Sequence, residues 1–319
     1  MSKKHVFGPV PSRRLGRSLG VDLVPYKYCS FDCIYCQLGR TTQKTIERKE
    51  YVPTDEVISD VRDKLDDPGI MLPDYITFSG SGEPTLHSGI GRMINEIKEF
   101  TAIPVAVLTN GSLLYQPEVR KEISRADLVV PSLDAGDEET YRKMNRPVEG
   151  ISFEKIISGL IRFRKEFDNR IWLEVFLVAG INDTEDQVRK IAEYIREIKP
   201  DRIQVNTTTR PAAEDYAKPV PPDRLHRLAE ILYPTAEVIA DFRHSGNLQG
   251  FAPQKQDVLD LLMRRPCSLE DISAGLGLHK TEAGKYAGEL IEEGVVEKLS
   301  TSGKTYFKGI ASSENHEQQ

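Results

Sequence analysis

Residues 28–37 read YCSFDCIYCQ. Here Cys29, Cys33 and Cys36 are separated by three and then by two residues. A structural zinc site needs four ligands, and no histidine stands at the spacing that would complete one with these cysteines. Iron–sulfur clusters are bound by cysteine thiolates, normally four for a cubane. Three thiolates in one loop therefore predict a cluster in which one iron stays open to an exogenous chelating ligand.

Composition limits the cellular setting. Of the 319 residues, 29% are charged and 39% are hydrophobic, as in ordinary globular proteins. Four cysteines are too few for a secreted disulfide framework. The N-terminus lacks the apolar segment of a signal peptide, and no apolar run is long enough to span a membrane. We therefore expect a cytoplasmic protein without membrane contact.

Charge is unevenly distributed, although the net charge is only −6. Residues 1–50 contain ten Lys and Arg against four Asp and Glu, and this basic arm surrounds the cysteines. The excess can steer an anionic ligand toward them or simply form a solvated surface. The net charge of the whole chain offers no general reason to expect nucleic acid.

From residue 53 onward, apolar runs alternate with helical stretches. One such stretch, residues 184–198, begins with a capping box of Thr184 and Gln187. The runs expected to contain strands are residues 74–85, 103–112, 126–136, 170–183, 201–208 and 236–241. Five or six strands separated by helices predict an α/β fold with a parallel sheet, open or curled into a barrel. The polar ends of these runs should meet at the carboxyl edge, where such sheets carry their chemistry.

The pattern changes after about residue 250. Three helices are predicted over residues 250–266, 268–277 and 279–294, and two strands over residues 295–309. This order is typical of a winged helix-turn-helix. The expected domains are residues 1–250 with the basic arm, residues 251–311 as the winged helix, and residues 312–319 as a disordered tail. Cys267, at a predicted helix start, is interpreted as a thiol without a cluster role.

The cysteine loop, with Tyr35 beside its last cysteine, resembles the cluster loop of the radical S-adenosylmethionine (radical SAM) superfamily. Residues 79–85, SGSGEPT, resemble the glycine-rich motif of that superfamily, and residues 132–136, SLDAG, resemble its ribose-contacting strand end. The resemblance extends through residues 6–240. It implies a partial (β/α)6 barrel, followed here by the winged-helix domain.

The resemblance also implies two cofactors. They are a [4Fe–4S] cluster bound by Cys29, Cys33 and Cys36, and S-adenosylmethionine (SAM), whose amino and carboxylate groups would chelate the open iron. An electron from a donor such as flavodoxin or ferredoxin would cleave SAM to methionine and a 5′-deoxyadenosyl radical. That radical would abstract hydrogen from a substrate.

By the same resemblance, six residues are candidate SAM contacts. They are Gly80, Gly82, Glu83, Asn110, Ser132 and Asp134. The glycines would let the backbone approach the methionyl amino group, and Ser132 and Asp134 would meet the ribose hydroxyls. Glu83 and Asn110 have structural alternatives as a strand-end residue and a turn former. Arg142 or Arg146 is a candidate for the SAM carboxylate, with helix-surface charge as the alternative, and Asn182 and Asp183 either line the rim of the site or form a turn. Candidate substrate contacts at the sixth strand end are Asn206, Thr208 and Arg210. The sequence names no catalytic residue.

Residues 7–41 most resemble a branch related to the wyosine-base tRNA synthases. Those enzymes bind a second cluster through additional N-terminal cysteines, and this chain has no cysteine before Cys29. Three hypotheses remain. They are a radical SAM enzyme acting on a protein or RNA docked by the C-terminal domain, a radical SAM enzyme acting on a small molecule beneath that domain as a lid, and an iron–sulfur DNA-binding regulator. The predicted recognition helix carries more Glu than Lys, which argues against duplex DNA.

Overall fold

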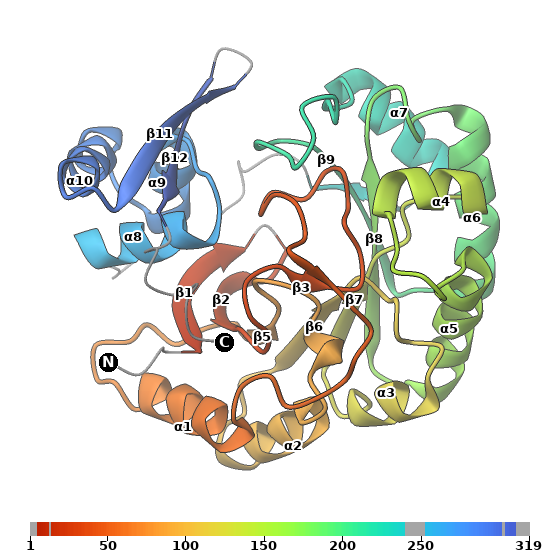
Figure 1. Cartoon of the computed structure of the whole chain (residues 1–319), viewed down its shortest axis with the longest axis horizontal. Coiled ribbons are helices and arrows are strands. Elements are labelled where there is room, and N and C mark those ends of the chain that lie inside the picture. The colour runs from red at the N-terminus through yellow and green to blue at the C-terminus, as the bar shows by residue number, and fades with distance from the viewer. Residues whose placement is uncertain (1–4, 13, 240–252, 302–303, 311–319) are drawn as a thin grey trace.

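The larger part of the protein has an α/β fold built on one curved β-sheet (Figure 1). The computed structural model describes residues 5–12, 14–239, 253–301 and 304–310. The strands of the main sheet are β1 (Val6–Ser12), β2 (Gly16–Val21), β5 (Tyr75–Phe78), β6 (Val105–Thr109), β7 (Leu128–Pro131), β8 (Arg170–Leu177), β9 (Arg202–Thr207) and β10 (Glu237–Val238). Their spatial order is β1-β2-β5-β6-β7-β8-β9-β10. The pair β1–β2 is antiparallel, and every other neighbouring pair is parallel.

Helices cover the outer face of this sheet (Figure 1). They are α1 (Thr54–Leu65), α2 (Ile90–Phe100), α3 (Pro117–Glu122), α4 (Glu138–Asn145), α5 (Phe153–Glu166), α6 (Glu185–Ile198) and α7 (Pro222–Leu232). A short 3-10 helix, η1 (Pro84–Leu86), follows β5, and the two-residue strands β3 (Tyr28–Cys29) and β4 (Gln43–Lys44) pair beside the cysteine loop. The expected α/β fold with a mostly parallel sheet and crossover helices is confirmed.

The hairpin of β1 and β2 lies outside the runs that the sequence pattern marks as strands. Pro9 and Pro11 interrupt β1, and each removes a donor from the ladder. The sheet accommodates them because β1 is its edge strand, bonded only to β2 in the described part of the chain. Since β2 pairs with β5, the parallel sheet begins before residue 53, and the cysteine loop follows one of its strands.

Period-two alternation divides the strand side chains between two apolar clusters. On β6, Val105 and Val107 pack with the outer helices, whereas Ala106 belongs to an inner cluster together with Trp172 of β8. Glu174, two residues beyond Trp172, is polar. The interior of the curved sheet is therefore apolar at one level and polar nearer the carboxyl ends of the strands.

Only one of the two hydrogen bonds of the predicted capping box of α6 is present. The Thr184 side chain accepts a hydrogen bond from the Gln187 amide at 3.3 Å, as expected. The Gln187 side chain does not return to Thr184, because its Oε1 accepts from the Gly136 amide at 3.1 Å and its Nε2 donates to Asp137 at 2.6 Å. Gln187 thus ties α6 to the segment after β7.

Three helices and a two-stranded sheet form a C-terminal unit. Its elements are α8 (Lys255–Arg264), α9 (Leu269–Leu276), α10 (Lys280–Glu292), β11 (Val296–Thr301) and β12 (Lys304–Gly309). They enclose their own apolar cluster, which includes the buried Cys267. This element order agrees with the expected one. The boundary expected at residues 250–251 and the tail at residues 312–319 lie outside the described residues.

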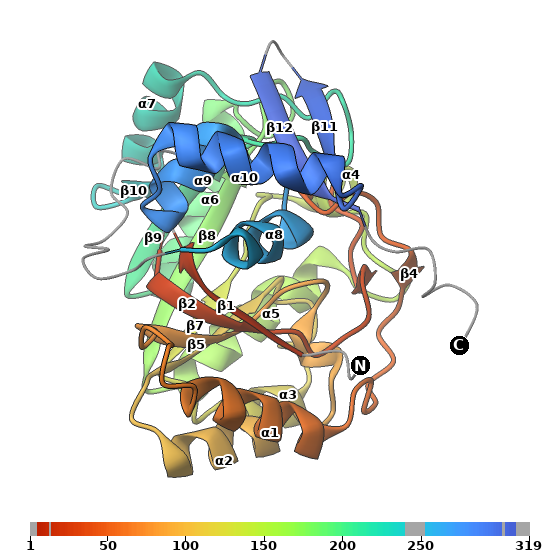
Figure 2. The same cartoon turned by 90° about the vertical axis from the view of Figure 1, so that its left-hand side faces the viewer.

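The C-terminal unit packs on the edge of the sheet. Helices α8 and α9 both contact β1, and Figure 2 shows α8 lying next to the hairpin of β1 and β2. Elsewhere on the unit, the Tyr306 hydroxyl of β12 donates to the Thr209 carbonyl, after β9, at 3.3 Å. The unit therefore contacts segments from both ends of the curved sheet.

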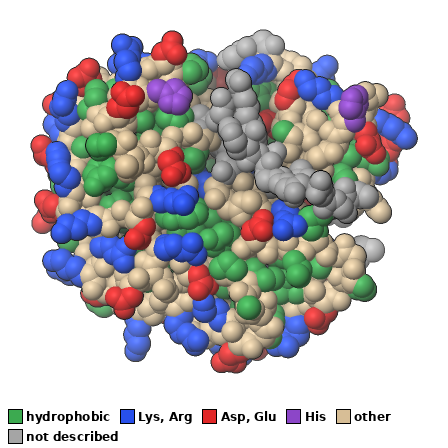
Figure 3. All heavy atoms as spheres, turned by 180° about the vertical axis from the view of Figure 1, so that it is seen from behind, with side chains coloured by type: hydrophobic (Ala, Val, Ile, Leu, Met, Phe, Trp, Pro, Cys, Tyr) green, Lys and Arg blue, Asp and Glu red, His purple; other side chains and the backbone are tan. Residues whose placement is uncertain are grey.

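Charges of both signs are mixed on the surface. Figure 3 shows Lys and Arg side chains interspersed with Asp and Glu on the face seen from behind, with apolar side chains between them. No helix within the described ranges is both long enough and apolar enough to cross a membrane.

Two glycines inside helices provide a matched test of packing. A Cβ on Gly159 of α5 would lie 2.6 Å from the Tyr115 nitrogen, whereas a Cβ on Gly288 of α10 would meet no atom within 4 Å. We expect Gly159→Ala to destabilise the protein by about 1–3 kcal/mol, because backbone must move. Gly288→Ala should stabilise it by up to about 1 kcal/mol, since alanine is the better helix former. Scanning calorimetry should show a lower melting temperature for Gly159→Ala and a higher one for Gly288→Ala. Shifts of both melting temperatures in the same direction would contradict this packing.

Candidate active site

The loop that carries the three cysteines is held by the end of α4. The amides of Asp32 and Ile34 donate to the carbonyl groups of Asn145 and Met144, both at 3.0 Å. The last carbonyl groups of a helix have no partner within the helix, so the loop satisfies two of them. The position of the loop is therefore set by the segment that follows β7.

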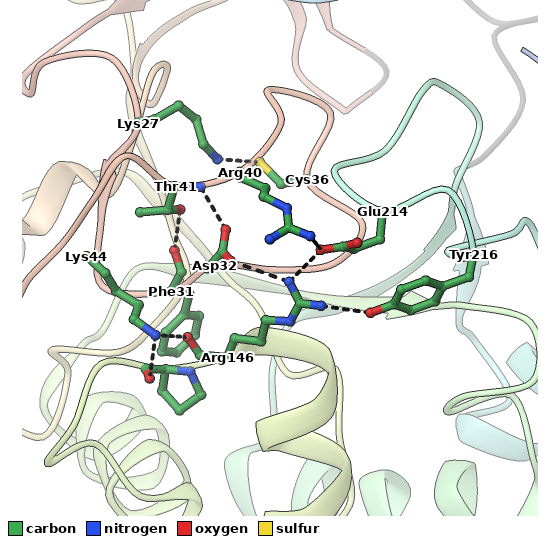
Figure 4. Close-up of polar contacts among 11 residues, drawn as sticks. Lys27, Phe31, Asp32, Cys36, Arg40, Thr41, Lys44, Arg146, Glu214 and Tyr216 are labelled. Atoms are coloured by element: carbon green, nitrogen blue, oxygen red, sulfur yellow. Dashed lines mark hydrogen bonds and ion pairs between the residues drawn. The ribbon is translucent and has the colours of Figure 1, made fainter.

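Each cysteine sulfur accepts a hydrogen bond from one side-chain nitrogen. The pairs are Lys27 Nζ to Cys36 Sγ at 3.1 Å, Asn110 Nδ2 to Cys29 Sγ at 3.5 Å, and Asn145 Nδ2 to Cys33 Sγ at 3.5 Å. Lys27 precedes the loop, Asn110 follows β6 and Asn145 ends α4. Figure 4 shows the Lys27 side chain directed at Cys36. An N–H donor of this kind stabilises negative charge on the sulfur that it contacts.

Burial by itself opposes the thiolate state. It raises the pKa of Cys29 to about 12, and the pKa of Cys33 is also raised, first by burial and then by Cys29 and Cys36. A bound metal reverses this, because a coordinating thiol is deprotonated. In the described part of the chain, no three His, Cys, Asp or Glu side chains converge as a single metal ion requires. That the three cysteines bind a cluster stays a prediction at this point, and it rests on their spacing and on the thiolate ligands that such clusters require.

The glycine-rich segment after β5 packs against the stem of the cysteine loop. A Cβ on Gly82 would lie 1.9 Å from the Tyr28 carbonyl oxygen. One on Gly80, where φ is +112°, would lie 1.7 Å from Asp22 Oδ1, which also accepts a hydrogen bond from the Ser81 amide at 2.9 Å. Contacts within the protein therefore require glycine at both positions. Their approach to the methionyl group of SAM stays a prediction.

The Glu83 carboxylate joins the ends of β5 and β6. It is 2% exposed and accepts hydrogen bonds from Thr85 (N at 3.1 Å, Oγ1 at 2.6 Å), Thr109 Oγ1 at 2.6 Å and the Asn110 amide at 2.7 Å. Burial raises the pKa of Glu83, although these bonds act in the opposite direction. The geometry favours its structural alternative: Glu83 caps η1 and positions Asn110, whose side chain reaches Cys29.

Asp134 is the centre of a buried hydrogen-bond cluster after β7. Its Oδ2 accepts from the Tyr35 hydroxyl and from Asn145 Nδ2 at 2.9 Å, and its Oδ1 accepts from the Phe176 amide at 2.9 Å. The ring of Tyr35 stacks on Phe176 with centroids 4.0 Å apart. Burial raises the pKa of Asp134 to about 6. Because Asn145 also bonds Cys33, this carboxylate is coupled to a predicted cluster ligand.

Three other candidates serve the fold. Asn182 Nδ2 donates to two strand-end carbonyl groups at 2.7 Å, and Asp183 pairs with Arg224 at 3.0 Å, so both residues shape the turn after β8. Arg142 forms an exposed ion pair with Glu138, four residues earlier, at 2.5 Å. For these three, the structure agrees with the turn and surface alternatives.

Three candidates lie at the carboxyl ends of β7 and β9. Ser132 is partly exposed and stands two residues before Asp134. Asn206 Nδ2 donates to Glu174 Oε1 at 3.0 Å. Thr208 is 8% exposed, and its hydroxyl has no hydrogen-bond partner among the described residues. These side chains stay candidate ligand contacts.

Arg210 lies at the contact with the C-terminal unit. It is 6% exposed, its Nη1 donates to Gln37 Oε1 at 3.3 Å, and its Nη2 is 4.0 Å from Asp271 of α9. Burial lowers its pKa to about 10, and the nearby Arg265 adds to this effect. Since Gln37 directly follows Cys36, Arg210 connects the cysteine loop to α9.

Arg146 anchors the outer side of the cysteine loop (Figure 4). It follows α4 in the left-handed region (φ 44°), and its guanidinium contacts Glu214 at 2.6 Å, the Tyr216 hydroxyl at 2.8 Å and Asp32 at 3.5 Å. Arg40 pairs with the same Glu214 carboxylate at 2.9 Å. This network favours a structural role for Arg146 over contact with the SAM carboxylate.

A cavity of about 330 Å³ lies between the glycine-rich segment, the β1–β2 hairpin and the C-terminal unit. Its lining includes residues 79–82, Arg14 from the hairpin turn, and Leu261 and Met263 of α8. Arg14 pairs with Glu174, and its Nε is buried without a partner in the described ranges. Both parts of the protein therefore enclose the cavity.

Sequence reasoning missed Lys27, Asn145 and Arg14. Lys27 stands two residues before Cys29, so its nearness to the loop is visible in the sequence, but the direction of its side chain is not. Asn145 and Arg14 reach the site through a helix–loop contact and through the curvature of the sheet. Neither arrangement leaves a signal in the sequence.

Comparison with known proteins finds relatives over most of the chain. The family model of the radical SAM superfamily matches residues 23–195. A UPF0026 protein of Methanocaldococcus jannaschii is 34% identical over 314 residues, which cover 96% of each chain. A GTPase Obg of Brachyspira hyodysenteriae is 37% identical over 308 residues. That alignment covers 95% of this chain but 45% of the relative, so this chain spans less than half of it.

One similar solved structure is that of a radical SAM methyltransferase from Sphaerobacter thermophilus. It has a TM-score of 0.53 and 19% identity, over 69% of this chain and 66% of that one. At this identity the likeness concerns the fold, an α/β architecture with a mostly parallel sheet. Residues 23–195, matched by the family model, include the cysteine loop, the glycine-rich segment and the end of β7.

Gly82 provides a test of how the glycine-rich segment supports the cysteine loop. We expect Gly82→Ala to lose most of its iron and acid-labile sulfide after anaerobic reconstitution, because the new Cβ would displace the Tyr28 backbone. Gly69→Ala, in an exposed loop where a Cβ comes no closer than 3.4 Å to another residue, is the control. Normal iron content in Gly82→Ala would contradict this role.

Proposed function

Since the chain belongs to the radical SAM superfamily and to the UPF0026 family, we propose that it cleaves SAM reductively and abstracts hydrogen from a substrate. The chain is an enzyme of this superfamily, whose cofactors are a [4Fe–4S] cluster and SAM. The observation that carries the proposal is the cysteine loop, in which each of three thiols faces one N–H donor. We assign Cys29, Cys33 and Cys36 as the cluster ligands.

The side chains around the loop have separate tasks in this proposal. When bound, the cluster and SAM supply the radical chemistry. Gly80 and Gly82 bring backbone next to the methionyl group, while Glu83 holds the strand ends in position. Asp134 accepts a ribose hydroxyl. Within the described residues its Oδ1 accepts a hydrogen bond only from the Phe176 amide, and a carboxylate oxygen has about two acceptor sites.

The substrate class is the finer part of the proposal. A protein or RNA docked by residues 251–311, proposed as a winged-helix domain beside the barrel domain of residues 1–250, is one candidate. The cavity favours the other candidate, a small molecule beneath a lid, because Leu261 and Met263 of α8 contribute to its wall. On this geometry we place the small molecule first.

Two other assignments receive less support. In α10, Lys280 pairs with Glu270 at 2.8 Å and Lys285 lies 3.9 Å from Glu289, so both lysines of this helix have acidic neighbours. Such a helix is poorly suited to phosphates, which weakens the iron–sulfur DNA-binding regulator. We also keep as a proposal that residues 7–41 are related to the branch of the wyosine-base tRNA synthases. This proposal does not include the second cluster of those enzymes, because no cysteine precedes Cys29.

Enzymes of this superfamily need an electron donor. We propose a flavodoxin or a ferredoxin for this role. Gln37, directly after Cys36, is exposed, so the cysteine loop reaches the surface where a donor can approach. A cytoplasmic location, where thiols stay reduced, is the prediction from cysteine usage.

The central test is SAM cleavage by the reconstituted protein. With dithionite under anaerobic conditions, we expect methionine and 5′-deoxyadenosine, together with the brown absorbance of the cluster. Cys33→Ala should lose both, because it removes one of three ligands. Cys267→Ala is the matched control, since this thiol is buried in the C-terminal cluster. Cleavage by Cys33→Ala, or loss of the cluster in Cys267→Ala, would overturn the ligand assignment.

Removal of the C-terminal unit tests its role as a lid. We expect a chain ending at Asp241 to retain SAM cleavage, because all proposed cluster and SAM residues lie before that point. With cell extract as the source of substrate, hydrogen transfer from substrate into 5′-deoxyadenosine should disappear, since the cavity loses its α8 wall. Isotope labelling of the extract measures this transfer. If SAM cleavage itself is lost while circular dichroism still shows a folded barrel, the unit is instead part of the SAM site.

A further inference from the structure

Lys27 is a buried charge without a carboxylate partner. It is 3% exposed, and its Nζ donates to Cys36 Sγ at 3.1 Å (Figure 4). Among the described residues, the charged groups that act on this nitrogen are Cys36, Cys29 and Cys33, and no ion pair with a carboxylate is found. An unpaired ammonium in such a site is costly, so a buried charge requires a compensating one. The group that lies in position to compensate it is the sulfur of Cys36.

The backbone fixes Lys27 from two sides. Its amide donates to the Ser81 carbonyl at 2.6 Å, and its carbonyl accepts from the Thr42 and Gln43 amides at 3.2 and 3.3 Å. These bonds join the glycine-rich segment to the far end of the cysteine loop. Lys27 has a positive φ of 62°, which is uncommon for a side chain other than Gly, Asn or Asp. The site therefore holds this lysine in one place relative to Cys36.

Lys27 differs from the other two donors in charge. Asn110 and Asn145 offer neutral amide N–H groups to Cys29 and Cys33, at 3.5 Å each. A bond from an ammonium is shorter and stronger, and it brings a full positive charge. The reduction potential of an iron–sulfur cluster depends on net charge, on hydrogen bonds to its sulfurs and on solvent exposure. At the Cys36 sulfur, Lys27 adds both a positive charge and a hydrogen bond.

We propose that Lys27 raises the reduction potential of the cluster, so that the external donor can reduce it. This inference rests on the proposed function, in which Cys36 is a cluster ligand. With the cluster bound, reduction would transfer one electron from the donor to it and add one negative charge there. A fixed positive charge at Cys36 stabilises the reduced form more than the oxidised form. Lys27 itself neither gives nor takes a proton or an electron.

The test is a redox titration of the reconstituted full-length protein, followed by electron paramagnetic resonance of the reduced cluster. At a fixed potential near the midpoint, we expect Lys27→Met to lower the ratio of reduced to oxidised cluster roughly tenfold. For a one-electron couple this is a midpoint shift of about 59 mV to more negative values. Lys27→Arg keeps the charge and should recover most of the shift. Lys44→Met removes an exposed lysine of the same region, bonded to backbone carbonyl groups, and should leave the midpoint unchanged.

A second variant separates the charge from the hydrogen bond and covers the case in which Lys27→Met does not hold a cluster. Lys27→Gln keeps an N–H donor without the charge, so its midpoint should fall between those of the parent and Lys27→Met. A loaded Lys27→Met or Lys27→Gln protein with the midpoint of the parent would overturn the inference and leave the proposed function intact. Failure of the parent itself to assemble a cluster would instead overturn the proposed function.

Discussion

The three N–H···S contacts on the cysteine loop join parts of the chain that are far apart in sequence. Their donors come from the stem of the loop, from the end of β6 and from the end of α4. Each donor is itself held by other bonds: Asn110 by Glu83, Asn145 by Asp134, and Lys27 by the glycine-rich segment. A change in the geometry of any of these three segments would therefore alter the hydrogen bond to a cysteine sulfur.

Two buried carboxylates carry this coupling. Glu83 accepts four hydrogen bonds and Asp134 accepts three, so neither acid is left without partners in a site of low dielectric. Both acids hold residues that touch cysteines, in addition to any contact with SAM. Removal of either would leave several buried donors unsatisfied, which costs more than the loss of one bond. The ends of β5 and β6, through Asn110, and the segment after β7, through Asn145, are thus each bonded to the cysteine loop.

The C-terminal unit adds a constraint from the opposite side. It has its own apolar cluster, yet α8 and α9 lie on β1, and Asp271 of α9 approaches the buried Arg210. Arg210 in turn reaches Gln37, the residue after Cys36. This chain of contacts connects the cysteine loop with a unit that begins more than two hundred residues later. It explains how a separately packed element can share the wall of the cavity.

The sequence by itself determined the alternation of strands and helices, the cysteine spacing and the polar strand ends, because these depend on local periodicity and on residue type. It also determined the order of elements in the C-terminal unit, where Gly277 closes α9 as a C-cap. The edge hairpin of β1 and β2 was not predicted from the sequence, because its two prolines argue against a strand unless that strand lies at the edge of a sheet. The tertiary structure alone decided which donor faces which sulfur, why Gly80 and Gly82 have no room for a side chain, and that Arg210 is buried. Those properties depend on the packing of segments distant in the chain, and local sequence patterns do not encode the direction of a side chain across such a contact.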